Sequence, residues 1–98
     1  MEKGTPNCSL SQIKNLVEAG KVRSTMSALS GAAALGFDFD GIVEIVMSLT
    51  AKDFYKSMTT YSNHRIWQDV YRPHTPEGKV YLKLIVIEDV LIVSFKEL

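Results

Sequence analysis

The sequence predicts an α+β domain in which helices pack on one face of a mainly antiparallel sheet. In the first half of the chain, apolar residues recur with the spacing of a helix; from about Tyr55 onward, β-branched and aromatic residues alternate with a period of two. A length of 98 residues suits a single domain over residues 1–98. The content of 46% hydrophobic and 22% charged residues excludes both a disordered chain and a membrane protein.

The first expected helix covers residues 10–19. Ser9 followed by Gln12 has the pattern of a capping box, in which each residue satisfies a free backbone amide of the other. Gly20 stands where a left-handed helix end requires glycine.

Two more helices and one isolated turn follow. Residues 25–35 are rich in alanine and predict a second helix, although Gly31 inside it costs about 1 kcal/mol of helix propensity. A third helix is expected after Asp40. Thr50 with Asp53 predicts one further capped turn.

The second half of the chain predicts four strands, over residues 55–61, 65–73, 79–87 and 90–96. The short segment 21–25 is expected to add a fifth strand at an edge of the sheet. Helices that precede a run of consecutive strands are typical of the α+β class.

Strand alternation predicts which side chains the helices leave uncovered. In the third strand the apolar side consists of Val80, Leu82, Leu84 and Val86. In the fourth strand it consists of Leu91, Val93 and Phe95. The second strand is ambiguous, because both of its sides mix apolar and polar residues. One consistent solution is a free face that bears Lys56, Gln68, Tyr81, Lys83 and Lys96.

The charge distribution is more informative than the net charge. Eleven basic and eleven acidic residues cancel, but residues 52–83 contain six basic against three acidic residues, an excess of three positive charges. Exposed lysines usually serve solubility, Tyr81 could be a cross-strand packing partner, and Gln68 could be a neutral surface residue. From the sequence pattern alone, these residues could therefore also form an ordinary solvent-exposed surface without a binding function.

The expected face nevertheless suits a phosphodiester. Lysine offers compact positive charge to phosphate oxygens, tyrosine a hydroxyl and a stacking surface, and glutamine an uncharged donor and acceptor. RNA carries its own nucleophile, the 2′-hydroxyl, so its cleavage needs no metal and no nucleophilic side chain. His64 and His74 lack the spacing of a metal pair and read as polar surface.

The cysteine count and the N-terminal segment predict the cellular compartment in which the protein works. Cys8 is the single cysteine, so it forms no disulfide within the chain, and no cationic start precedes an apolar run. We expect a cytoplasmic protein that does not associate with membranes.

Several segments resemble the motility quorum-sensing regulator (MqsR) toxins of the RelE-like group of bacterial mRNA interferases. They are "MEKGTP", "GKVRST", "LGFDFDG", "DFYKSMTTYSNHRIWQDVYRP", "VYLK" and "DVLIVSFKE". The resemblance implies a RelE-like fold and a type II toxin that cleaves mRNA at GCU-type sites without the ribosome, which inhibits translation and growth. It also implies the catalytic residues Lys56, Gln68, Tyr81 and Lys96. We expect Arg72 and Lys83 to bind RNA beside them. Asn63 and Arg65 depart from the family's "SDHTIW" form, which bears on substrate preference.

The resemblance also implies a partner and no cofactor. The partner is a cognate MqsA-like antitoxin with a zinc-binding domain and a helix-turn-helix domain that binds operator DNA, so that this chain meets DNA only through the antitoxin. Two other functions stay open. One is a module that binds RNA or the antitoxin without cutting, and the other is a toxin directed at DNA gyrase.

Overall fold

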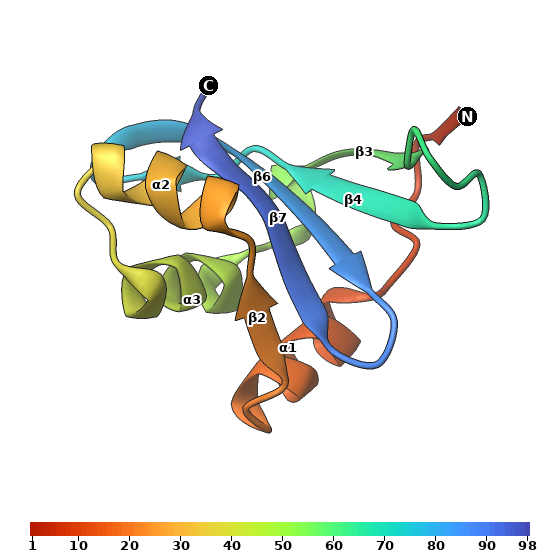
Figure 1. Cartoon of the computed structure of the whole chain (residues 1–98), viewed down its shortest axis with the longest axis horizontal. Coiled ribbons are helices and arrows are strands. Elements are labelled where there is room, and N and C mark those ends of the chain that lie inside the picture. Colours follow the sequence, from red (N-terminus) through yellow and green to blue (C-terminus); the bar gives the residue numbers. More distant parts are fainter.

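Seven strands and three helices build the molecule, and the computed structural model describes all 98 residues (Figure 1). The helices are α1 (Leu10–Glu18), α2 (Met26–Ala34) and α3 (Phe39–Ser48), with a 3-10 helix η1 (Ala51–Asp53). The strands are β1 (Glu2–Lys3), β2 (Val22–Ser24), β3 (Phe54–Thr59), β4 (Trp67–Tyr71), β5 (His74–Thr75), β6 (Gly78–Val86) and β7 (Val90–Glu97). The expected α+β class is confirmed.

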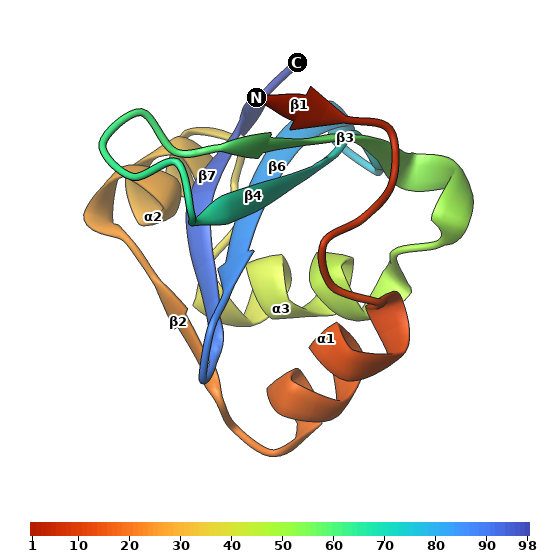
Figure 2. The same cartoon turned by 90° about the vertical axis from the view of Figure 1, so that its right-hand side faces the viewer.

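The sheet has the order β1-β3-β4-β6-β7-β2, and β5 pairs with β6 outside this path. Every pair is antiparallel except β2 with β7, which is parallel. Helices α1 and α3 lie beneath the sheet and α2 lies against β7, whereas both chain ends lie on the side away from α1 and α3 (Figure 2). The sheet therefore has one covered and one open face.

The first and third helices are capped by side chains, and the sequence predicts the cap of the first. Ser9 Oγ accepts a hydrogen bond from the amide of Gln12 at 3.1 Å, and Gly20 adopts a φ of 78° just beyond the end of α1. The prediction that the third helix follows Asp40 was wrong by a few residues. Its N-cap is Asp38, whose carboxylate accepts from the amide of Gly41 at 2.8 Å.

The predicted turn after α3 is the helix η1. The amide of Thr50 donates to Asp53 Oδ2 at 2.8 Å, which is one half of the predicted capping box. This turn leads directly into β3. It thereby fixes where the strand that carries Lys56 begins.

The strand predicted over residues 65–73 is shorter and is followed by the separate strand β5. Pro73 has no amide hydrogen to donate to the sheet. The amide of Arg72 donates to the carbonyl of Asp53 at 2.7 Å instead. The expected edge strand at residues 21–25 is confirmed as β2, whereas β1 was not predicted, because a two-residue strand has no detectable alternation.

The core lies between the covered face of the sheet and the helices. In β7, the residues that point into this core do not alternate regularly along the strand. The predicted apolar side of Leu91, Val93 and Phe95 is confirmed for Phe95 and was wrong for Leu91 and Val93: the buried residues are Val90, Ile92 and Phe95. Lys83 pairs with Ser94 but Leu84 pairs with Ile92, which leaves an extra residue in β7. Such a bulge reverses the side to which the following residues point.

Gly31 allows α2 to approach β7 closely. A Cβ atom at this position would lie 2.1 Å from the backbone oxygen of Phe95. Helix propensity predicts that Gly31→Ala stabilises the protein by about 1 kcal/mol. We expect the opposite, a loss of about 3 kcal/mol in the free energy of unfolding, because α2 must move away from the sheet.

Urea denaturation measures this difference. Ser30→Ala is the matched control, because Ser30 is exposed in the same helix and should change the unfolding free energy by less than about 0.5 kcal/mol. A gain in stability for Gly31→Ala would contradict the close packing of α2 on β7.

Candidate functional site

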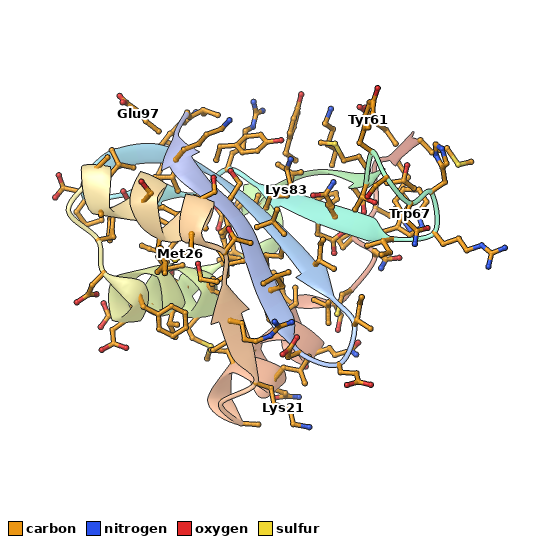
Figure 3. All side chains as sticks on the ribbon, viewed as in Figure 1. Lys21, Met26, Tyr61, Trp67, Lys83 and Glu97 are labelled. Atoms are coloured by element: carbon orange, nitrogen blue, oxygen red, sulfur yellow. The ribbon has the colours of Figure 1, made fainter.

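The open face of the sheet carries a row of residues that runs across four strands. Lys56 on β3 pairs with Val70 on β4, Val70 pairs with Lys83 on β6, and Lys83 pairs with Ser94 on β7. Residues directly opposite one another in antiparallel strands point to the same side of the sheet. Two lysines thus share the open face, and Figure 3 labels Lys83 near the middle of the sheet.

A second row lies beside the first. Tyr81 on β6 pairs with Lys96 on β7. The register between β6 and the preceding strands is the same at Tyr71 and at His74, so Arg72 lies opposite Tyr81. Arg72 and Lys96 are exposed, and Tyr81 is half-buried between them.

Gln68 also points to this side, because it pairs with Met58, two residues beyond Lys56 on the same strand. Its exposed fraction is only 9%, so it lies at the base of the face and not on its rim. The structure thus brings all six predicted side chains to one face of the sheet.

Two tyrosine rings lie between the cations of this face. Lys83 Nζ and Lys96 Nζ lie 5.7 and 5.3 Å from the centre of the Tyr81 ring. The guanidinium carbon of Arg72 lies 3.8 Å, and Lys56 Nζ 5.3 Å, from the ring centre of Tyr55. The negative π faces of the rings attract the cations, which helps like charges to gather on one surface.

The lysines of the face differ in their electrostatic surroundings. Partial burial, together with the positive charges of Lys96 and Lys56, lowers the pKa of Lys83. Lys56 has the opposite shift: its hydrogen bond to the Glu2 carboxylate, at 2.8 Å, raises its pKa. Lys83 therefore gives up its charge more readily than Lys56.

Two residues of this region were missed by reasoning from the sequence. Glu2 reaches the face because β1 pairs with β3, and nothing in a two-residue strand indicates that pairing. Tyr55 reaches it because the register shifts between Phe54 and Lys56. The aromatic richness of residues 53–73 was the available signal for Tyr55, but strand alternation could not reveal the bulge.

An open hollow of about 400 Å³ borders the face on the β1 side and is lined by Glu2, Lys3, Gly4, Tyr55 and Lys56. A second hollow, of about 300 Å³, is mainly apolar and is lined by Pro6, Leu10, Ala51, Phe54 and Tyr71. It contains none of the cations. No three His, Cys, Asp or Glu side chains lie where they could hold a metal ion. None of the helices has both the length and the apolar character needed to span a membrane.

The fold and this face define a small α+β protein with a cationic, tyrosine-containing sheet surface of the kind that binds phosphodiesters. Residues 5–97 match the family described as "Motility quorum-sensing regulator, toxin of MqsA". The chain is also 64% identical to the mRNA interferase toxin MqsR of Escherichia coli (strain K12), over 97 residues that cover 99% of each chain. The chain therefore belongs to the MqsR toxin family.

Proposed function

We propose that this chain cleaves mRNA at GCU-type sites, with the open face of the sheet as its active site and without the ribosome or a metal ion. The coarser activity follows from the family: the chain is a type II toxin with endoribonuclease activity. The observation that carries the proposed site is the convergence of Lys56, Tyr81 and Lys96 on one uncovered sheet face.

Lysines on this face would hold the scissile phosphate. As the 2′-oxygen attacks, negative charge builds on the phosphorane oxygens, and the ammonium groups of Lys56 and Lys96 stabilise it. The Tyr81 hydroxyl contacts the same phosphate, since its ring lies beside Lys96 and Lys83. Attack from within the chain gives a 2′,3′-cyclic phosphate and a 5′-hydroxyl.

The neighbouring side chains would hold the nucleotides that flank the cut. Tyr55 is 44% exposed and its ring is backed by the Arg72 guanidinium, so the ring offers a platform for a base. Gln68, at the base of the face, can donate to and accept from a nucleotide without adding charge. Lys83 contacts the phosphate backbone.

The test is incubation of the purified protein with a defined RNA that contains one GCU site, with and without EDTA, followed by mapping of the 5′ ends. An RNA of the same composition with the site scrambled is the matched control. We expect one cut, equal in the presence of EDTA, with a 5′-hydroxyl on the downstream fragment. Retention of the RNA in a gel without fragments would instead support a binding module.

The family also implies a partner, because its description names a toxin of MqsA. We propose that a cognate antitoxin binds this chain through a zinc-binding domain and carries the helix-turn-helix that contacts operator DNA. Titration calorimetry with that antitoxin, before and after removal of its zinc, tests this. Unchanged affinity of the zinc-free, still folded antitoxin would contradict it.

A further inference from the structure

The proposed reaction needs a proton acceptor for the 2′-hydroxyl. A lysine ammonium or a tyrosine phenol must first lose its own proton to act as one, and the ordinary pKa of both groups lies near ~10, although burial and neighbouring charges lower the pKa of Lys83. A carboxylate, which is ionised at neutral pH, accepts a proton without first losing one.

Glu2 brings such a carboxylate to the face. It pairs with Met58 on the neighbouring strand, so it points to the same side of the sheet as Lys56. Its Oε2 atom lies 2.8 Å from Lys56 Nζ, and its side chain is 60% exposed. Asp69, the acid on β4, points to the opposite side and is buried.

We propose that Glu2 is the general base that takes the proton of the 2′-hydroxyl, a role that rests on the function proposed above. The ammonium of Lys56 has three N–H groups, of which one bonds Glu2 and two are free for a phosphate oxygen. Two acceptors of one ammonium lie about 4.5 Å apart. A 2′-oxygen poised for attack lies about 3–3.5 Å from phosphorus, a spacing that allows it to lie within hydrogen-bond reach of the carboxylate.

The positions of the strands suit the direction of the reaction. The proton passes from the 2′-oxygen to Glu2, the bond between the 2′-oxygen and phosphorus forms, and the bond to the 5′-oxygen breaks. The 5′-oxygen takes a proton from Tyr81 or Lys96. Since β1 lies on one side of β3 and β4, and β6 and β7 lie on the other, base and acid approach the phosphate from opposite sides (Figure 2).

Several charged or titratable groups surround Glu2: Lys56 and Tyr55 on the β3 side, and its two neighbours in the chain, Lys3 and the amino group of Met1. The hydrogen bond and the positive charge of Lys56 hold the pKa of Glu2 below its ordinary value. The carboxylate is therefore ionised at neutral pH, the state in which it can accept a proton, and the transfer of the proton from the 2′-hydroxyl works against this lowered basicity.

The experiment measures kcat and KM on the GCU-containing RNA between pH 4 and 8. Glu2→Gln should lower kcat by about 100-fold with little change in KM. Glu2→His should restore part of kcat and should move the acidic limb of the rate profile up to the ordinary pKa of histidine, about 6.5. Glu18→Gln, an exposed glutamate at the end of α1, should behave as wild type.

Three outcomes would overturn the proposal. A Glu2→Gln variant with unchanged kcat and pH profile would show that Glu2 does not take the proton. A lower KM with higher kcat would show that Glu2 competes with the phosphate for Lys56. An intact wild type that binds RNA without cutting it would overturn the nuclease itself. Thermal melting of both variants keeps loss of folding apart from loss of activity.

Discussion

Replacing Lys56 with alanine should lower the rate of RNA cleavage by about 100- to 1000-fold. The reason is position: Lys56 lies on the same face of the sheet as Lys83 and bonds the Glu2 carboxylate at 2.8 Å. The substitution removes the positive charge that would stabilise the phosphate, and it leaves the Glu2 carboxylate without its hydrogen-bond partner. The melting temperature should hardly change, because exposed ion pairs contribute little to stability.

Initial cleavage rates at saturating RNA measure the effect, and Lys21→Ala is the matched control. Lys21 is exposed in the turn between α1 and β2, far from the open face (Figure 3). Tyr81→Phe should also lower the rate without lowering stability, because it removes only the hydroxyl. A Lys56→Ala variant that cuts as fast as Lys21→Ala would remove Lys56 from the active site.

Asp69→Ala should lower the free energy of unfolding by about 4 kcal/mol. Asp69 is only 3% exposed, and its carboxylate accepts hydrogen bonds from the amides of Asn7 and Cys8 and from the hydroxyl of Ser57, at 2.6–3.1 Å. Truncation removes the acceptor of the Asn7 and Cys8 amides and the nearer of the two acceptors of the Ser57 hydroxyl, whose other acceptor is the carbonyl of Gln68 at 3.3 Å. The same change frees the segment that follows β1, so it should also loosen the position of Glu2.

Urea unfolding followed by fluorescence of Trp67 measures the loss. Glu18→Ala removes an exposed carboxylate and should change the unfolding free energy by less than about 0.5 kcal/mol. Hydrogen exchange of the amides of Asn7 and Cys8 should accelerate in Asp69→Ala. Equal stability of the two variants would show that the buried hydrogen bonds do not anchor the N-terminal segment.

The helices and long strands were predictable because their signals are local. Ser9 with Gln12 and Thr50 with Asp53 are capping patterns within four residues, and Val80, Leu82 and Leu84 alternate along a strand whose register is regular through Lys83. The same alternation predicted the shared face of Tyr81, Lys83 and Lys96, whereas it left the strand of Gln68 and Arg72 ambiguous.

The rest depends on contacts between distant parts of the chain. The sequence did not show to which side of the sheet Asp69 points, because its partners, Asn7 and Cys8, lie more than 60 residues earlier. The bulge in β7 reversed the buried side, and the bulge at Tyr55 brought that ring beside Arg72. Gly31 looked unfavourable in a helix, since the approach of Phe95 that requires it is invisible in the local sequence.

The two chain ends lie on the side of the sheet that the helices leave open (Figure 2). The Met1 amino group donates to Thr59 Oγ1 at 3.0 Å, and the amide of Leu98 donates to the carbonyl of Lys79. An affinity tag or fluorescent protein fused to either end would lie over the face that we propose binds RNA. Purification tags are better inserted in the turn around Lys21. Low activity is then not caused by a tag that blocks the open face.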